Sequence, residues 1–225
     1  TGDVVASGRS AHAVVTPPCS EQDPRSWWNA FEDAWAQGNV ARVDAIAIGG
    51  QQHGMVALDA DDVPVHPAKL WNDTESDPDA AWLIDQLGSP AAWAEAVGSV
   101  PVAAFTVTKL SGLHRTDPGA WQQLARVLLP HDYLTHRLNG DYTTDRGDAS
   151  GTGYWDPHTE RYRHDLLALI DEDRDWTDVV PTVLGPMESA GRWNGALVAP
   201  GSGDNMAAAL GVGLRPGDSM MSIGT

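Results

Sequence analysis

The sequence contains a single cysteine, Cys19, among its 225 residues. One cysteine cannot form a disulfide within the chain, so a disulfide-stapled secreted scaffold is excluded. No apolar run approaches the roughly 18 residues that a membrane-spanning helix needs, and no signal peptide is recognisable. These absences predict a cytoplasmic protein without a membrane partner.

Basic residues are scarce as well, with 14 Lys and Arg against 31 Asp and Glu and a formal net charge of −17. A chain of this charge repels the phosphate backbone of DNA and RNA, so we expect no nucleic-acid partner. A phosphorylated ligand would need local backbone N–H groups or a metal ion for its binding.

Several familiar metal-binding and catalytic motifs are missing. None of the eight histidines lies in an HExxH pattern, and one cysteine leaves no zinc ligand set. The acidic run Asp171–Asp175 lacks the glycine and glutamate that a calcium loop requires. There is no P-loop and no G-x-S-x-G nucleophile elbow. The sequence therefore predicts no metal ligands of its own.

Predicted strands and helices alternate along the chain. Asp or Ser before Pro marks helix starts at residues 23–24, 77–78, 89–90 and 117–118. A strand or hairpin is expected over residues 4–15, and short strands over 42–50, 68–73 and 126–130. This alternation indicates an α/β fold, a mixed β-sheet flanked by helices.

Two of the predicted strands end in polar, glycine-rich clusters, Gly49–Gly54 and Gly201–Asn205. Ligands of α/β proteins bind beyond the carboxyl ends of strands, so both clusters are candidate sites. In the second, Asp204 opens an alanine-rich helix. It has two interpretations: an ordinary N-cap, or a base beside the Asn205 amide, fixed and ionised by the helix N-terminus and suited to phosphoryl transfer.

The first cluster carries Gln52 and His53, which offer hydrogen-bond donors and acceptors without formal charge. That chemistry suits a sugar or polyol better than an anion, although a turn facing water would look the same. Trp71, Asn72 and Asp73 close a neighbouring strand, and an indole beside an amide and an acid can hold a sugar face. The alternative for Trp71 is a place in the core.

Taken together, four stretches resemble the FGGY family of carbohydrate kinases, and within it the members that phosphorylate xylulose. They are "GGQQHGMVALD", "AKLWND", "VLLPHDYLTHRLNGDYTTDRGDASGTGYWD" and "GSGDNMAAALGVGLRPGDSMMSIGT". The resemblance implies an actin-like ATPase (ribonuclease-H-like) domain. Residues 1–225 would form its N-terminal, sugar-binding lobe, without the family's first strand or hairpin and without the C-terminal nucleotide lobe. We expect these residues alone to have no kinase activity.

The resemblance also implies a reaction, ATP-dependent phosphorylation of D-xylulose to D-xylulose 5-phosphate, with Mg²⁺ arriving with ATP. Asp204 corresponds to the catalytic base. The substrate-binding residues would be Gln52, His53 and Asn205, with Trp71 and Asp73 in a pocket-forming loop. Gly224 and Thr225 would begin the phosphate-binding turn. Gly112 departs from the pattern, because the family usually carries Trp there.

Alternatives remain open at this point. The substrate could be another ketose or polyol, such as ribulose, fuculose or glycerol, or the chain could be a non-catalytic sugar-binding module. A hydrolase would use Asp204 with Asp73, whose carboxyls would then lie about 5–5.5 Å or 6.5–9.5 Å apart. The expected partners are a small sugar and ATP, and a homodimer is left open.

Overall fold

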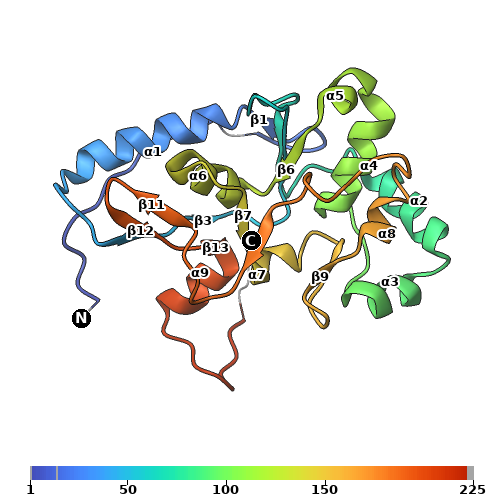
Figure 1. Cartoon of the computed structure of the whole chain (residues 1–225). Helices are drawn as coiled ribbons and strands as arrows, with labels where there is room; N and C mark the ends of the chain where they lie inside the picture. The colour runs from blue at the N-terminus through green and yellow to red at the C-terminus, as the bar shows by residue number, and fades with distance from the viewer. Residues whose placement is uncertain (1, 14, 222–225) are drawn as a thin grey trace.

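A computed structural model of the chain describes residues 2–13 and 15–221 and shows an α/β architecture (Figure 1). The helices are α1 (Arg25–Gly38), α2 (Asp77–Leu87), α3 (Pro90–Val97), α4 (Thr106–Thr116), α5 (Pro118–Gln123), α6 (Pro130–Asn139), α7 (Arg146–Ala149), α8 (His164–Leu167) and α9 (Asp204–Gly211). Among the described residues, no helix combines the length and the apolar character required to cross a bilayer.

The strands are short and pair in both directions. They are β1 (Glu21–Gln22), β2 (Ala45–Ile46), β3 (Gly49–Gly50), β4 (Val56–Leu58), β5 (Ala68–Lys69), β6 (Arg126–Leu128), β7 (Thr143–Asp145), β8 (Trp155–Asp156), β9 (Arg161–Tyr162), β10 (Thr182–Leu184), β11 (Gly191–Trp193), β12 (Ala196–Val198) and β13 (Ser202–Gly203). Antiparallel pairs are β1–β5, β4–β6, β8–β9 and β11–β12. Parallel pairs are β2–β12, β3–β13 and β7–β10. The mixed pairing matches the predicted class, although it is divided among several small sheets.

The four predicted helix starts at Asp-Pro and Ser-Pro are confirmed. Helices α1, α2, α3 and α5 begin within two residues of these dipeptides, and the Ser89 hydroxyl accepts a hydrogen bond from the Ala92 amide. Three aromatic side chains of α1 pack against other aromatic residues. Trp27 is buried edge-to-face against Tyr133, while Phe31 and Trp35 pack on Trp193.

Helix α4 was not anticipated from the sequence. Its β-branched residues and Gly112 are poor helix formers, and its N-cap residue Phe105 offers no side-chain cap. Residues 106–113 are all buried, so packing on every side stabilises this helix where local propensity would not. It lies in the main hydrophobic core, where residues of α2–α5 and α8 pack against one face of β4 and β6.

The strand or hairpin predicted over residues 4–15 is not found among the described residues, and the strand predicted over 42–50 was wrong in part. Residues 2–13 form no strand and pair with no strand. This segment lies against α1 instead, where the Arg9 amide donates to Gln37 Oε1 at 3.0 Å. The expected buried strand over 42–50 is two separate pieces, β2 and β3, that are not buried. At the other end, residues 218–221 carry no strand, and the predicted phosphate-turn residues Gly224 and Thr225 lie outside the described residues.

Candidate functional site

The two polar clusters meet because their strands are parallel neighbours. Ser202 pairs with Gly49 and Gly203 with Gly50, so both chains leave the β3–β13 pair at the same edge. The approach is close. A Cβ placed on Gly203 would lie 2.6 Å from Cγ of Gln52, so only glycine leaves room for that side chain. The two candidate clusters therefore lie side by side at this edge.

One pocket, of about 330 Å³, lies beyond these strand ends. Its lining consists of five residues that the sequence had singled out: Gln52, His53, Trp71, Asp204 and Asn205. They come from three separate segments, which follow β3, β5 and β13. Asp204 supplies the only formal charge among them, so the lining suits an uncharged polyhydroxy ligand next to one carboxylate.

Asp204 is exposed and is the first residue of α9. The N-cap position belongs to Gly203, and no side chain caps this helix. Within the part of the chain that the structure describes, the Asp204 carboxylate accepts no hydrogen bond and forms no ion pair. The ordinary N-cap interpretation is therefore not what the geometry shows, and the carboxylate is free to meet a ligand.

The other polar groups of the pocket hold one another in fixed orientations. Asn205 Nδ2 donates to Gln52 Oε1 at 2.6 Å, which leaves the Gln52 amide nitrogen and Asn205 Oδ1 available. His53 Nδ1 lies 2.8 Å from the Gly151 carbonyl oxygen, so Nδ1 carries the proton and Nε2 is an acceptor. The His53 ring stacks on Phe105, with 5.0 Å between ring centroids.

Trp71 is 57 % exposed and lines the pocket, so the core alternative for this residue does not hold. Its backbone amide donates to Gln51 Oε1 at 3.2 Å, which ties its loop to the residue after β3. A large apolar side chain left in water beside polar groups offers a flat surface to the carbon face of a sugar.

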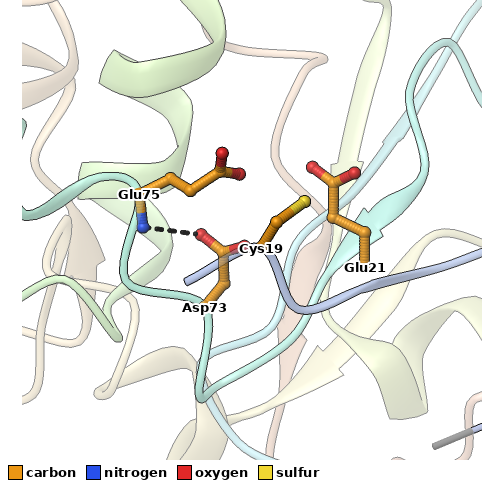
Figure 2. A group of neighbouring side chains, drawn as sticks. All are labelled: Cys19, Glu21, Asp73 and Glu75. Atoms are coloured by element: carbon orange, nitrogen blue, oxygen red, sulfur yellow. Dashed lines mark hydrogen bonds between the residues drawn. The ribbon is translucent and has the colours of Figure 1, made fainter. Parts of the chain in front are cut away.

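Asp73, which the sequence grouped with these residues, does not line the pocket. Its side chain is fully buried, and Oδ2 accepts from the Ser20 amide at 2.9 Å while Oδ1 accepts from the Glu75 amide at 3.2 Å. The second of these bonds is drawn in Figure 2. The carboxylate thus joins the β5 loop to the segment before β1.

Figure 2 shows Asp73 in a cluster with Cys19, Glu21 and Glu75, which we call the Asp73 cluster. Lys69 supplies its positive charge, with Nζ 2.7 Å from Glu21 Oε1, 2.9 Å from Glu75 Oε2 and 3.6 Å from Asp73 Oδ2. Burial alone would lower the pKa of Lys69, but these carboxylates raise it. Burial and the neighbouring acids raise the pKa of the Cys19 thiol to about 11, which favours its protonated form.

Behind the pocket lies a second cluster, the His131 cluster, formed by His131, Asp132, Asp145 and Asp148. Its imidazole packs against the strand ends: a Cβ on Gly50 would lie 3.0 Å from His131 Cβ, and one on Gly201 would lie 2.7 Å from Nδ1. Burial alone would lower the pKa of His131, but the carboxylates raise it. Sequence analysis missed the cluster, because its members come from α6, β7 and α7 and follow no motif spacing.

Gly112, the departure from the family pattern, lies inside α4 and does not line the pocket. A Cβ there would lie 2.9 Å from Ser76 Oγ. It borders a different cavity of about 230 Å³, together with Cys19 and Lys69. The absence of a large side chain at this position therefore leaves the pocket wall unchanged.

Comparisons with known proteins agree on one family. Residues 1–211 match the sequence profile of the "FGGY family of carbohydrate kinases, N-terminal domain". The xylulose kinase of Streptomyces coelicolor is 51 % identical over 236 residues, which cover 100 % of this chain and 48 % of that protein. The chain thus spans about half the length of the curated relatives it matches.

Solved structures give the same result. The crystal structure of xylulose kinase from Bifidobacterium adolescentis superposes with a TM-score of 0.87 at 38 % identity, covering 96 % of this chain and 51 % of that one. Glycerol kinase from Plasmodium falciparum, solved with ADP, shares the fold at a TM-score of 0.76 and 16 % identity, covering 89 % of this chain and 44 % of its own. The predicted actin-like ATPase fold is confirmed, and the chain belongs to the FGGY family of carbohydrate kinases.

Proposed function

We propose that this chain supplies the sugar pocket of a kinase that transfers the γ-phosphoryl group of ATP to the 5-hydroxyl of D-xylulose. The relatives named above as xylulose kinases support this substrate. The observation that carries the proposal is the pocket itself, in which one unpaired carboxylate, Asp204, lies among neutral hydrogen-bonding groups and an exposed indole.

The neutral groups would bind and orient the sugar. His53 Nε2 accepts from one hydroxyl, since its Nδ1–H is already committed to the Gly151 carbonyl. The Gln52 amide N–H groups donate to a second oxygen and Asn205 Oδ1 accepts from a third, because their mutual bond fixes both amides. Trp71 would cover the carbon face. A site built to pair hydroxyls discriminates strongly against ligands that lack them.

Asp204 would act as the general base. The sugar 5-hydroxyl oxygen attacks the γ-phosphorus, the bond from this phosphorus to the β,γ-bridging oxygen breaks, and ADP leaves. The hydroxyl proton passes to the Asp204 carboxylate. In the loose transition state of phosphoryl transfer this proton moves late, so a positioned carboxylate suffices as base.

The nucleotide, which supplies the phosphoryl group with its Mg²⁺, would be held largely by residues beyond those described, including Gly224 and Thr225. We therefore expect residues 1–225 alone to bind the sugar but not to phosphorylate it, as befits an N-terminal, sugar-binding lobe. A cytoplasmic location and a homodimer also stay predictions.

The competing functions have less support. A two-carboxylate hydrolase needs a second acid across the cleft, but Asp73 is buried, bonded to backbone amides and outside the pocket. A non-catalytic module would not require an unpaired carboxylate. Another ketose or polyol as substrate would leave the mechanism unchanged and alter only the hydroxyls that meet Gln52 and His53.

The test is ADP release by the purified full-length protein with D-xylulose, D-ribulose, L-fuculose, gluconate and glycerol as substrates. We expect the highest kcat/KM with D-xylulose. A higher value with another polyol would contradict the substrate and keep the reaction. Absence of ADP release with every compound, despite measurable sugar binding, would support the non-catalytic module instead.

A further inference from the structure

The His131 cluster gathers one imidazole and three carboxylates in the interior. His131 Nε2 lies 3.1 Å from Asp148 Oδ2, 3.2 Å from Asp145 Oδ1 and 3.3 Å from Asp132 Oδ1. The side chains of His131, Asp132 and Asp148 are fully buried, and that of Asp145 is 16 % exposed. Three carboxylates this close together must be neutralised by a positive charge or by protons, because burying unpaired ions is costly.

Five buried polar atoms of this cluster are also left without hydrogen-bond partners among the described residues. In the described ranges, no hydrogen bond is made by either ring nitrogen of His131, by either carboxylate oxygen of Asp148 or by Oδ1 of Asp132. Buried polar atoms are rarely left in this condition unless a ligand satisfies them. The Asp73 cluster is different, because the Lys69 ammonium lies within reach of its three carboxylates.

The donor set and its spacing fit a metal ion. One ligand atom from each of His131, Asp145 and Asp148 lies within 4.8 Å of the others. Donors bound to one ion at ~2.0–2.2 Å lie ~3.0–3.4 Å from each other in octahedral or tetrahedral geometry, close to the Nε2–oxygen distances here. Imidazole with carboxylates is a ligand set for Mn²⁺ or Zn²⁺.

The carboxylates are held in place by the backbone. Asp145 Oδ2 accepts from the Gly147 amide at 2.8 Å, and Asp132 Oδ2 accepts from the Leu129 amide at 2.9 Å. Outer contacts of this kind orient ligands toward an ion. The partly exposed Asp145 gives an ion a route from solvent.

We propose that His131, Asp145 and Asp148 bind one divalent cation of the Mn²⁺ or Zn²⁺ class, with Asp132 adding charge beside it. This ion is distinct from the Mg²⁺ that accompanies ATP, since its ligands all belong to the chain.

The effect of the ion on the sugar pocket follows from the contacts of its ligands. The His131 ring packs on Gly50 and Gly201 behind the strand ends, and Gly151, just after α7, holds His53. The ion therefore fixes the floor of the sugar pocket.

The experiment measures metal binding in the absence of nucleotide and sugar, so its outcome is independent of kinase activity. The purified full-length protein is stripped with a chelator and titrated with Mn²⁺, with free Mn²⁺ followed by electron paramagnetic resonance. We expect one ion per chain at this site. Asp148→Asn and His131→Lys should each weaken Mn²⁺ binding at least tenfold, the second because an ammonium would fill the cluster as Lys69 fills the other. Glu75→Gln, in the Asp73 cluster, is the matched control and should bind as the wild type does.

Three results would overturn the site. Wild-type protein that binds neither Mn²⁺ nor Zn²⁺ would mean that a proton on His131 supplies the positive charge. Unchanged affinity in Asp148→Asn or His131→Lys would place the ion elsewhere. If both variants fail to fold, as judged by circular dichroism, X-ray absorption of the Zn²⁺-loaded wild type decides: we expect one imidazole nitrogen with oxygen ligands, and a shell without imidazole would refute the assignment.

Discussion

Asp73 and Asp204 both follow a short strand in a polar stretch, and their surroundings could hardly differ more. Asp73 is fully buried, with its two oxygens bonded to the amides of Ser20 and Glu75 and with Lys69 nearby. Asp204 is exposed and has no hydrogen-bond partner in the residues that the structure covers. The Asp73 carboxylate already accepts hydrogen bonds from the protein, whereas the Asp204 oxygens remain available to a ligand.

This difference teaches how a structural carboxylate is told from a candidate functional one. Residue type and strand-end position are shared, so they do not discriminate. What discriminates is the number of backbone amides that reach the oxygens, because an amide-bonded, buried carboxylate holds loops together. The predictions below test this division from its largest expected effect to its smallest.

The largest effect is expected on the Asp204 side. Asp204→Asn removes the proposed base, and kcat should fall by about 10²–10⁴-fold, since that is the usual contribution of a positioned base. Stability should hardly change, because the carboxylate makes no hydrogen bond or ion pair with the described residues. The measurements are steady-state ADP release and a melting curve. Asp77→Asn, an exposed aspartate in the first turn of α2, is the matched control and should keep full activity.

Asp73→Asn should show the reverse pattern. The amide can accept only through its oxygen, so at least one bond to a backbone amide is lost and Lys69 loses part of its counter-charge. We expect the free energy of unfolding to drop by about 2–4 kcal/mol. Urea denaturation measures this, with the exposed Asp61→Asn as control. A large rise in the KM for the sugar without a loss of stability would instead return Asp73 to the substrate site, where the sequence had placed it.

Gly151→Ala should sharpen the pocket side of the comparison. The added Cβ would lie 2.5 Å from Cε1 and 2.7 Å from Nδ1 of His53, so the ring must move away from the Gly151 carbonyl. The displaced ring would then lose its proposed hydrogen bond to the sugar. Loss of one hydrogen bond is worth about 1.4 kcal/mol, which raises the KM for the sugar about tenfold. Gly211→Ala, in the helix that Asp204 begins, meets nothing within 4 Å and should leave KM unchanged. Equal KM values in both variants would show that His53 does not bind the sugar.

The effect least connected with the two carboxylates concerns Lys109, near the Asp73 cluster. Its Nζ donates to the carbonyls of Ala103 and Ala104, and burial lowers its pKa from 10.5 to about 7, although Asp73 partly opposes this. Between about pH 7 and 10.5 the unfolded chain therefore binds more protons at this residue than the folded chain does. Its contribution to stability thus rises with pH in this window.

Lys109→Met should remove that contribution. We expect the free energy of unfolding of the wild type to increase, relative to that of the variant, between pH 7 and pH 9.5 in urea denaturation. The hydrogen bonds that the variant lacks are missing at both pH values, so they cancel in the comparison. Parallel pH profiles would show that Lys109 keeps an ordinary pKa in the folded protein.

Local sequence determined the helix boundaries. Asp or Ser before Pro started α1, α2, α3 and α5 as predicted, and Gly88, Gly98 and Gly140 ended three helices in the left-handed conformation. These signals work because capping groups and φ preferences act within a few residues. The glycine-rich ends of β3 and β13 could also be predicted from local sequence, and they contain most of the residues that line the pocket.

Only the tertiary structure decided the rest. Helix α4 forms because its residues are buried on every side, against their own propensity. Asp73 and Asp204 differ in environment because the amides of Ser20 and Glu75 reach one carboxylate, whereas no amide of the described residues reaches the other. His131 met Asp145 and Asp148 through the packing of α6 on β7. Contacts between residues far apart in the chain leave no local pattern, so spacing and composition fixed the candidates while packing assigned their roles.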